Sequence, residues 1–553
     1  MSTGHARRHG AVAALLALAV LNALWTLGNQ WPTPWPRLSA QIAPELLLLL
    51  LGLCGWLAWR GAASTRVLRC LAALTLVGVL ARYLDVTVQA VFGRAVNPYW
   101  DGRYLLSVLA LGGWSTWTML AGALALLLAV ALLYRLLLSA WRMLALALAA
   151  RRERAVTALL AAMLLALCVL PIGADGRRGQ ALRAAFARPV TPAIAHQAAL
   201  LASQLWPGTA ARPLAASPDL QAHSLAGLKG ADVLVVFLES YGVCTLDDAA
   251  QQSALAPARA RLARQLDGGG LGVVSARVRS PTFGGGSWLA HAALLTGVDT
   301  RNPGDYERLL ASDRPSLVSL FRAQGWRTVA WMPGLQRPWP EGRFYGFERY
   351  ADAQDIGYAG LPLGFWRIPD PAAMALLHQQ ELAAPAGARA PRFVVFPTLA
   401  SHAPFRPVPS FDGDWTRLAT PQAYSAAQIA QALAQPADWS QARPAYVEAI
   451  GASFDWLGSY LAGPAPRGLL TLVIGDHQPW AAVSGEGAAW DVPVHAISAD
   501  AQLLARFEAL GFTRGLTPAQ SAGAASAARP MQDLTALLLA AFDGRPIASL
   551  TGP

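Results

Sequence analysis

Charged residues are scarce in this chain of 553 residues. Asp, Glu, Lys and Arg make up 14% of it, whereas hydrophobic residues make up 54%. So little charge favours a membrane-embedded portion. The length exceeds what one ordinary core needs, so we expect at least two structural units.

Cysteine is scarce too. Cys54, Cys70 and Cys168 lie inside apolar runs, which leaves Cys244 alone in the rest of the chain. One cysteine excludes a disulfide framework there, and no CxxC motif suggests a metal or redox site. Cysteine therefore gives no indication of the compartment.

The net charge of +11 raises the question of a nucleic-acid partner. The sequence lacks a Lys/Arg-rich tract, a zinc knuckle and an aromatic RNA-binding signature. We therefore expect no nucleic-acid partner.

Long apolar runs are concentrated before residue 174. Since a spanning helix needs about 20 mostly apolar residues, we expect about five spans, at 11–28, 43–59, 66–84, 104–134 and 155–173. The first could be a signal peptide, but it has no clear cleavage site and we interpret it as retained. The fourth is long and contains Gly112-Gly113, so one or two spans remain open there.

The distribution of arginine predicts the orientation. The basic segments are the N-terminus and the second and fourth loops, with Arg7, Arg8, Arg60, Arg66, Arg135, Arg142, Arg151, Arg152 and Arg154. Basic loops face the cytoplasm. We therefore expect a multi-pass protein of the inner (cytoplasmic) membrane, with everything after residue 174 on the periplasmic, extracytoplasmic side.

The remainder divides into a proline-containing connecting arm, 174–229, and a catalytic domain, 230–553, after a transmembrane domain at 1–173. Short apolar runs at 233–238, 328–331, 393–396 and 469–474 are typical of strands covered on both faces. We expect an α/β domain whose mostly parallel sheet is covered by helices.

Acidic and histidine residues follow three of these strands. Glu239 comes directly after 233–238, Asp476 and His477 come after 469–474, and His402 follows 393–396. Ligands of open α/β sheets bind outside the carboxyl ends of the strands. A turn or helix cap would explain one such residue, but the convergence of several predicts a metal or catalytic site.

Ser287 is the nucleophile candidate. It follows the glycines at 284–286 and opens an apolar stretch, so we expect it near a helix N-terminus, where anions are favoured. A divalent cation held by Glu239, Asp476 and His477 could activate its hydroxyl. Simple helix capping is the alternative interpretation.

These motifs resemble the sulfatase/alkaline phosphatase superfamily. The glycine of Leu294-Leu295-Thr296-Gly297 lies ten residues after Ser287, as in sulfatases, and three other superfamily motifs follow in order: Phe-Leu-Glu-Ser at 237–240, Ser-His-Ala-Pro-Phe at 401–405 and Gly-Asp-His at 475–477. With the apolar segments ahead of it, the chain looks like the membrane-anchored branch of lipoteichoic acid synthases and phosphoglycerol or phosphoethanolamine transferases.

The resemblance implies a role for each residue. Glu239, Asp476 and His477 would be metal ligands, with Ser287 as nucleophile and fourth ligand. His402 would contact the phosphoryl group, stabilising charge or protonating the leaving group. Substrate-binding candidates are His402, Trp339, Arg343 and His291, of which Trp339 also has an ordinary core interpretation and His291 a packing one.

Departures from the family matter for the chemistry. These transferases usually carry threonine where this chain has Ser287. Leu289 and His291 replace the Pro/Ala and Arg of the formylglycine signature, so we expect no formylglycine. Phosphoethanolamine transferases often have disulfide-rich domains, and the single cysteine here favours the phosphoglycerol side.

The resemblance thus implies a phosphotransferase that moves a phospholipid head group to a cell-envelope glycan or lipid acceptor through a covalent serine intermediate. A phosphate- or sulfate-ester hydrolase and an inactive sensor or scaffold remain alternatives. The ligand set suits one Mn²⁺ or Zn²⁺ ion, and Mg²⁺ less well. The sequence determines neither the donor and acceptor nor the oligomeric state.

Overall fold

The computed structural model describes residues 2–103, 115–169, 182–205, 213–519 and 528–544, apart from Pro338, Ala386, Pro436 and Ser440. The chain divides into two units, Met1–Ala210 and Ala211–Pro553. Gly112-Gly113 and the end of the fifth predicted span, residues 170–173, lie outside the described residues, so the question of one or two spans in 104–134 stays open.

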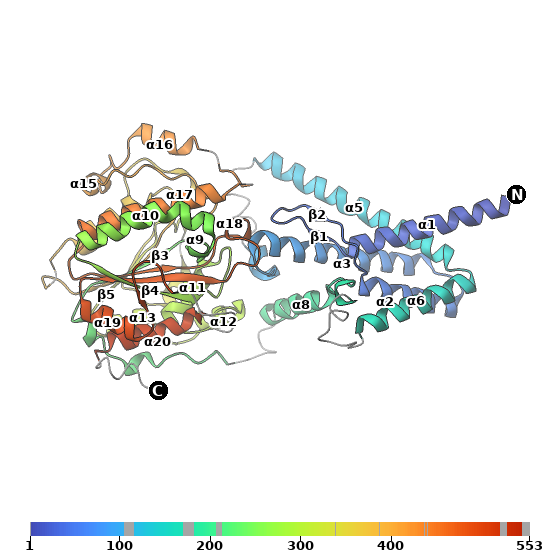
Figure 1. The fold of residues 1–553 in the computed structure, drawn as a ribbon, viewed down its shortest axis with the longest axis horizontal. Helices are drawn as coiled ribbons and strands as arrows, with labels where there is room; N and C mark the ends of the chain where they lie inside the picture. Colours follow the sequence, from blue (N-terminus) through green and yellow to red (C-terminus); the bar gives the residue numbers. More distant parts are fainter. Residues whose placement is uncertain are drawn as a thin grey trace. The chain divides into compact units, whose positions relative to one another are not determined.

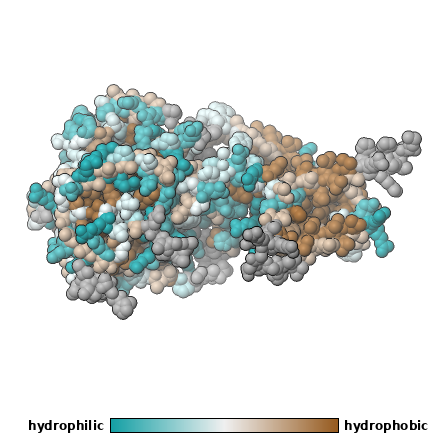
Figure 2. All heavy atoms as spheres, in the orientation of Figure 1, coloured by the Kyte–Doolittle hydropathy of each residue, from teal (hydrophilic) through white to brown (hydrophobic). Residues whose placement is uncertain are grey.

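The first unit is helical. Its elements are α1 (Ser2–Trp25), the short pair β1 (Gly28–Asn29) and β2 (Pro36–Arg37), α2 (Pro44–Arg60), α3 (Thr65–Phe92), α5 (Thr116–Ala147), α6 (Arg151–Val169) and α8 (Thr191–Leu205). Many large apolar side chains of these helices are exposed, including Leu124 and Leu128 of α5. Figure 2 shows apolar residues gathered on the surface of these helices.

The prediction of about five spans is wrong by length and composition, although helices cover all or part of every predicted run. Among the described residues, two helices, α3 and α5, are long and apolar enough to cross a membrane. α2 has 17 residues that include Glu45 and Arg60, and the apolar part of α1 is short, Gly10–Trp25. The 19-residue α6 begins with four charged residues, at 151–154.

The second unit is built on a nine-stranded mixed sheet (Figure 1). Its strands are β3 (Val233–Leu238), β4 (Gly272–Arg279), β5 (Arg327–Trp331), β6 (Arg349–Ala351), β7 (Arg392–Pro397), β8 (Leu470–Gly475), β9 (Asp491–Ser498), β10 (Thr513–Arg514) and β11 (Arg529–Pro530). They lie in the order β10-β4-β9-β8-β3-β7-β5-β6, with β11 paired to β4.

The expectation of a mostly parallel sheet is wrong. The four predicted strands, β3, β5, β7 and β8, form a parallel block with β6. Beyond β8, however, the pairings β8–β9, β9–β4 and β4–β10 are antiparallel. β4 mixes buried residues with more exposed and polar ones, such as Ser275 and Arg277, so it is not a continuous apolar run.

Helices cover both faces of the sheet (Figure 1). On one face lie α9 (Cys244–Asp247), α10 (Ala249–Gly268), α17 (Arg443–Ala462) and α18 (Ala481–Ser484). On the other lie α11 (Ser287–Thr296), α12 (Pro303–Leu310), α13 (Leu317–Ala323), α19 (Ala501–Ala509) and α20 (Met531–Phe542). Both faces of β3 are therefore buried, and all six of its residues are core.

Between β5 and α17 the chain also carries smaller elements. They are the 3₁₀ turns at Pro340–Phe344 and Gly364–Trp366, α14 (Asp370–Leu377), the π turn His378–Leu382, α15 (Trp415–Leu418) and α16 (Ala426–Leu433). A small apolar cluster, including Leu363, Ala372, Leu418 and Ile429, holds α14, α15 and α16 together.

Candidate active site

The register of the parallel block brings Glu239 and Asp476 to the same level. β3 pairs with β8 so that Leu238 lies opposite Gly475, and each carboxylate residue is the next along its strand. A glycine is required at 475 because a Cβ there would lie 1.9 Å from the carbonyl oxygen of Tyr241. Close approach of two strand ends therefore positions the two carboxylates.

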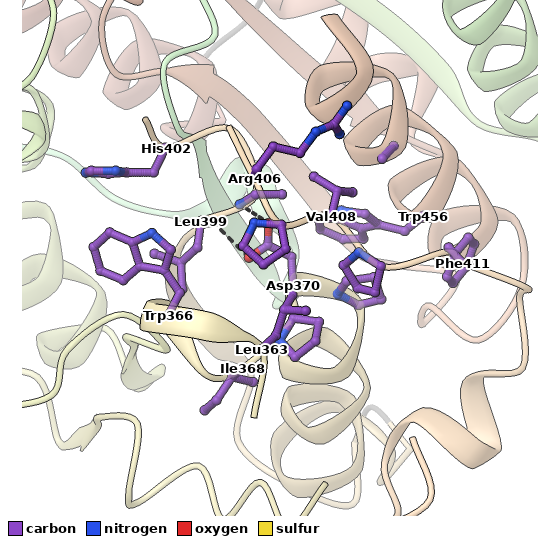
Figure 3. Close-up of a pocket in the computed structure, with 16 residues that line it drawn as sticks. Leu363, Trp366, Ile368, Asp370, Leu399, His402, Arg406, Val408, Phe411 and Trp456 are labelled. Atoms are coloured by element: carbon purple, nitrogen blue, oxygen red, sulfur yellow. Dashed lines mark hydrogen bonds between the residues drawn. The ribbon is translucent and has the colours of Figure 1, made fainter. Parts of the chain in front are cut away.

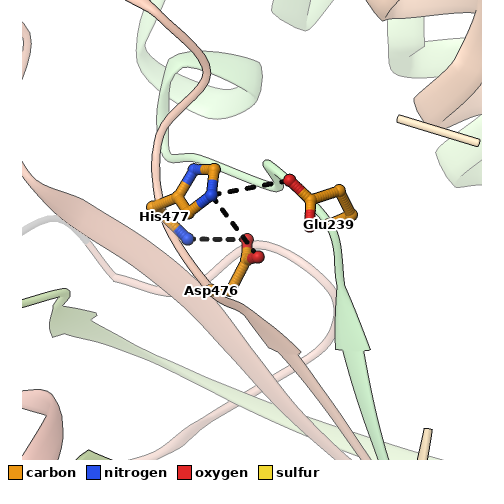
Figure 4. A group of neighbouring side chains, drawn as sticks. All are labelled: Glu239, Asp476 and His477. Atoms are coloured by element: carbon orange, nitrogen blue, oxygen red, sulfur yellow. Dashed lines mark hydrogen bonds and ion pairs between the residues drawn. The ribbon is translucent and has the colours of Figure 1, made fainter. Parts of the chain in front are cut away.

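Glu239, Asp476 and His477 form one buried group, which we call the carboxylate–histidine cluster (Figure 4). A ligand atom from each lies within 4.8 Å of those of the other two. Nε2 of His477 is 3.5 Å from Oε1 of Glu239 and 3.5 Å from Oδ2 of Asp476. The side chains thus point at a common centre.

The backbone around the cluster is held in a strained conformation. Ser240 has a φ of 54°, in the left-handed region that side chains other than glycine rarely adopt. Its amide donates to Oδ1 of Asp476 at 2.7 Å, its hydroxyl donates to Oε1 of Glu239 at 2.9 Å, and its carbonyl accepts from Tyr446 Oη at 2.8 Å. These three hydrogen bonds fix the turn after β3.

The orientation of His477 leaves one ring nitrogen for a ligand. Its Nδ1 lies 2.8 Å from the carbonyl oxygen of Gln478, which accepts a hydrogen bond and thereby places the proton on Nδ1. The lone pair of Nε2 then faces the cluster. Metal-ligating histidines commonly have this arrangement.

Ser287 lies against the cluster at the first residue of α11. Its Oγ is 3.2 Å from Oε2 of Glu239 and 3.2 Å from Nε2 of His477. The preceding Gly286 has a φ of 84°, which favours glycine, and the amide of Gly284 donates to the carbonyl oxygen of Gln478 at 3.0 Å. The glycine-rich loop is thus tied to the segment that carries His477.

The two carboxylates have opposite pKa shifts. Burial raises the pKa of Glu239 well above its usual value, and the neighbouring charge of Asp476 raises it further. Burial would also raise the pKa of Asp476, but His477 and His291 together with hydrogen bonds from Glu239 and Ser287 hold it below its usual value. Of the two carboxylates, Glu239 therefore binds a proton more readily than Asp476.

This donor set fits a divalent cation. Oδ2 of Asp476 is buried and accepts no hydrogen bond from the described residues, and buried polar atoms normally have a partner. Two carboxylates, one imidazole nitrogen and a hydroxyl within reach are ligands of transition-metal ions such as Zn²⁺ and Mn²⁺. A cation would satisfy Oδ2 and would compete with a proton for Glu239.

His402 lies on the segment that follows β7, the other neighbour of β3. Its Nδ1 is 2.8 Å from the carbonyl oxygen of Ala403, and its ring packs on Trp366 with centroids 4.7 Å apart (Figure 3). Burial lowers its pKa, although the hydrogen bond to the carbonyl oxygen of Ala403 opposes the shift. His402 is therefore neutral at physiological pH.

His291 occupies the next turn of α11 beyond Ser287. Its ring packs against Phe237 with centroids 4.0 Å apart, and its buried Nε2 has no hydrogen-bond partner among the described residues. Burial lowers its pKa to about 4, although the charge of Asp476 opposes the shift. The structure thus shows both the packing contact and a free nitrogen, so its substrate-binding role stays a prediction.

Trp339 and Arg343 are not brought into contact with the cluster. Trp339 packs on Tyr345 and Tyr350, with ring centroids 5.8 and 6.3 Å apart. Arg343 is exposed on its 3₁₀ turn. In the described part of the chain neither makes a hydrogen bond or ion pair to a cluster residue. Trp339 makes packing contacts, and the substrate-binding role of both residues stays a prediction.

The sequence interpretation missed two residues that organise the site. Gln478 is fully buried and bonds to the backbone at Cys244 and Ala489 through its side chain. Asp370 is 2% exposed and accepts from the amides of Leu399 and Ala400 at 2.8 and 2.9 Å. Gln478 adjoins a motif and could have been noticed; nothing local relates Asp370 to a segment 29 residues away.

Comparisons with known proteins add the following. No family model matches the chain, and no curated protein sequence matches it. Solved structures of the alkaline phosphatase superfamily are similar to it. One from Vibrio parahaemolyticus is 13% identical with a TM-score of 0.34, over 57% of this chain and 66% of that one, just under two thirds.

Two transferases are similar at the same level. The lipoteichoic acid synthase LtaP of Listeria monocytogenes is 13% identical over 52% of this chain and 69% of that one, with a TM-score of 0.31. The Streptococcus pyogenes phosphoglycerol transferase GacH is 12% identical over 51% and 77%, with a TM-score of 0.31. The superfamily expected from the motifs thus appears among the neighbours, but TM-scores this low assign neither a fold nor an activity to this chain.

Proposed function

We propose that this chain is a metal-dependent, membrane-anchored enzyme that transfers a phosphoryl-containing group through a covalent intermediate on Ser287. The observation that carries the proposal is the position of Ser287 Oγ, 3.2 Å from both Glu239 and His477. A serine that merely capped α11 would not need two buried metal-type ligands beside its hydroxyl. A bound divalent cation would polarise the phosphoryl oxygens and lower the pKa of the serine hydroxyl.

The residues account for the movement of protons in such a transfer. When Ser287 Oγ forms a bond to phosphorus, its proton has an acceptor at Glu239 Oε2, 3.2 Å away, because the lone pair of His477 Nε2 would be used by the cation. The bond from phosphorus to the donor's leaving oxygen breaks, and that oxygen takes the electron pair and, in the net balance, the proton released by Ser287. In the second step an acceptor hydroxyl bonds to phosphorus and gives up its proton, the bond from phosphorus to Ser287 Oγ breaks, and the serine oxygen takes the electron pair and, in the net balance, that proton.

His402 suits the second step. It is neutral, and the hydrogen bond of Nδ1 to the Ala403 carbonyl oxygen leaves the lone pair on Nε2. A neutral imidazole with a free Nε2 accepts a proton, here from the incoming hydroxyl. This role differs from the predicted protonation of the leaving group, which would need His402 in its charged form.

The finer assignment is that the transferred group is a phospholipid head group of the phosphoglycerol type, passed to a cell-envelope glycan or lipid. Motif order, the ten-residue spacing from Ser287 to Gly297 and the single cysteine of the domain support it. Two helices of sufficient length and apolarity support an anchor, which would hold the site close to a lipid donor. Arginine asymmetry supports placement on the periplasmic side.

The test is incubation of the full-length protein, loaded with Mn²⁺, with phosphatidylglycerol labelled in its head group. We expect a labelled glycerophosphoryl adduct on wild-type protein and none on Ser287→Ala. Ser425→Ala removes a capping serine at the start of α16 and serves as the matched control, which should form the adduct normally.

Each other result has a distinct meaning. Free glycerol phosphate without any acceptor adduct would replace the transferase by a hydrolase of the same chemistry. No adduct and no release from any phosphate or sulfate ester, in a protein that binds metal, would favour the inactive sensor or scaffold and overturn the proposal.

A further inference from the structure

Three buried side chains form a row of hydrogen bonds across the sheet, beside the carboxylate–histidine cluster. Oη of Tyr241 lies 3.1 Å from Nε2 of His495, and Nδ1 of His495 lies 2.6 Å from Oγ of Ser275. Oγ of Ser275 in turn donates to the carbonyl oxygen of Gly515 at 2.5 Å. We call Tyr241, His495 and Ser275, which are all buried, the cross-sheet network.

Each member of the cross-sheet network has a defined role as donor or acceptor. The hydroxyl proton of Ser275 is used by the carbonyl oxygen of Gly515, so Ser275 Oγ accepts the proton of His495 Nδ1. The lone pair of His495 Nε2 therefore accepts from the hydroxyl of Tyr241. Burial lowers the pKa of His495 to about 3, so the ring is neutral, as this arrangement requires.

The cross-sheet network passes over β8, the strand whose end leads into the cluster. Tyr241 follows β3, whereas His495 lies on β9, and β8 lies between these two strands. His495 is opposite Val473 of β8 and opposite Ser275 of β4. Residues directly opposite each other have side chains on the same face of a sheet. The hydrogen bond from Tyr241 to His495 therefore spans the width of β8.

Tyr241 also contacts the end of β8 through its backbone. Its carbonyl oxygen lies so close to Gly475 that a Cβ there would be 1.9 Å away. Gly475 directly precedes Asp476 in the chain. Ser240, which directly precedes Tyr241, binds both carboxylates of the cluster through its amide and its hydroxyl. A shift of Tyr241 would therefore move the two carboxylates relative to each other.

Ordinary packing does not call for polar side chains at these positions. Tyr241 packs on Phe454 of α17, and it shares an apolar core with Val473 and with residues of α10 and α17. Burying an imidazole and a hydroxyl costs free energy unless their polar atoms are bonded, whereas a bonded buried network holds its members in one arrangement. The group that this network holds in place next to the cluster is Tyr241.

We propose that His495 is a positioning residue of the metal site. By holding the hydroxyl of Tyr241, it clamps the end of β8 against the turn after β3 and so sets the separation of the ligands on the two strands. The inference rests on the proposed function and adds to it a residue outside the ligand set. Affinity for an ion depends on how firmly the surrounding groups hold its ligands, which here come from two strand ends.

The experiment uses two buried tyrosines that each bind a histidine. Tyr241 binds His495, and Tyr460 of α17 binds Nδ1 of His378 at 3.2 Å; both tyrosines are at most 1% exposed. Tyr241→Phe and Tyr460→Phe each delete one such hydroxyl, so Tyr460→Phe is the matched control for lost stability. The affinity for Mn²⁺ is measured by titration calorimetry on the full-length protein in lipid nanodiscs. Binding should weaken at least roughly ten-fold in Tyr241→Phe, as it does when support of metal ligands is lost, and should be unchanged in Tyr460→Phe.

Two substitutions of His495 separate the hydrogen bond from the packing of the ring. His495→Leu fills a similar volume but cannot accept a hydrogen bond from Tyr241, whereas the amide oxygen introduced by His495→Gln can. His495→Leu should weaken Mn²⁺ binding as Tyr241→Phe does, and His495→Gln should bind Mn²⁺ more tightly than His495→Leu. If His495→Leu does not fold, the two tyrosine variants decide the question.

Wild-type affinity for Mn²⁺ in Tyr241→Phe would overturn this inference and leave the proposed function standing. Equal weakening in Tyr241→Phe and Tyr460→Phe, or in His495→Leu and His495→Gln, would overturn it too, because affinity would then follow stability or packing. If the wild-type protein binds no Mn²⁺, the metal site of the proposed function is itself overturned, and this inference falls with it.

Discussion

Two buried carboxylate groups lie at opposite ends of the parallel strands and have opposite electrostatics. At the carboxyl ends, Glu239 and Asp476 face each other with one histidine and no arginine, and burial raises the pKa of Glu239. At the amino ends, Glu381 is held by three arginines from the first residues of β5, β6 and β7: Arg327, Arg349 and Arg392. Burial would raise the pKa of Glu381, but these arginines lower it below its usual value.

Hydrogen bonding of the carboxylate oxygens distinguishes a structural ion-pair group from a group that could bind a ligand. The Glu381 group is complete within the protein, because every carboxylate oxygen has a guanidinium partner. The carboxylate–histidine cluster is incomplete, because Asp476 Oδ2 lacks a hydrogen-bond partner among the described residues. Burying an uncompensated charge is expensive, so this cluster is where a cation from outside the chain would be favoured.

The largest expected effect is on catalysis at the carboxylate–histidine cluster. Ser287→Ala should lower the rate of head-group transfer by about 10⁴-fold or more, as removal of a covalent nucleophile does. Its metal content and unfolding temperature should stay close to those of the wild type, since the three ligands remain. A variant that transferred at a near-normal rate would contradict the assignment of Ser287.

The next largest effect is on the stability of the fold, at the Glu381 group. Glu381→Ala leaves three arginines without their carboxylate and should lower the free energy of unfolding by about 4 kcal/mol. Metal binding should persist in the fraction that remains folded. Urea denaturation followed by tryptophan fluorescence measures the change, and a loss under about 1 kcal/mol would show that the two groups are not distinguished in this way.

Asp370 provides a carboxylate of a third kind, buried but bonded to amides. Burial raises its pKa from 3.8 to about 6. The folded state therefore binds more protons than the unfolded state between these values, and stability falls as pH rises through that window. The shift corresponds to about 3 kcal/mol.

Asp370→Asn should remove this pH dependence. The difference in unfolding free energy between wild type and variant, measured from pH 3.5 to 7, should change in favour of the variant as the pH rises. Parallel curves for the two proteins would mean that Asp370 is not the titrating group. The variant tests the segment that carries His402 without changing a proposed metal ligand.

The smallest effect is stabilisation by the cation itself. At a free Mn²⁺ concentration about 100 times its Kd, the wild-type protein should gain about 2.7 kcal/mol. The gain should shrink as pH falls, because the raised pKa of Glu239 means that a proton competes with the ion. A gain of the same size in Asp476→Ala would place the ion elsewhere.

Much of the site could be predicted from the sequence, because its residues directly follow apolar strands. β3 is a continuous apolar run and β8 is an apolar run interrupted by Thr471, and Glu239 and then Asp476 and His477 come next in the chain after them. The spacing of Ser287 from Gly297 likewise coincides with the start and the cap of α11. For these residues, the position in the local sequence pattern is enough to predict the position in the folded domain.

The antiparallel part of the sheet could not be predicted, because it depends on contacts between residues far apart in the sequence. β9 is buried throughout yet contains Asp491, Pro493, His495 and Ser498, and only its partners make it a central antiparallel strand. His495 is buried there, and its two ring nitrogens form hydrogen bonds with Ser275 and Tyr241. Long apolar runs also overstated the spans, since α2 and α6 begin or end at charged residues that shorten them.

The most direct test is the metal content of the purified full-length protein after equilibration with Mn²⁺ or Zn²⁺ and removal of free ions. Elemental analysis by mass spectrometry should find about one ion per wild-type chain, as a single closed ligand set requires. It should find none in Asp476→Ala, and a wild-type amount in Arg349→Gln, which alters only the Glu381 group. Equal metal in wild type and Asp476→Ala would contradict the claim that the carboxylate–histidine cluster holds the ion.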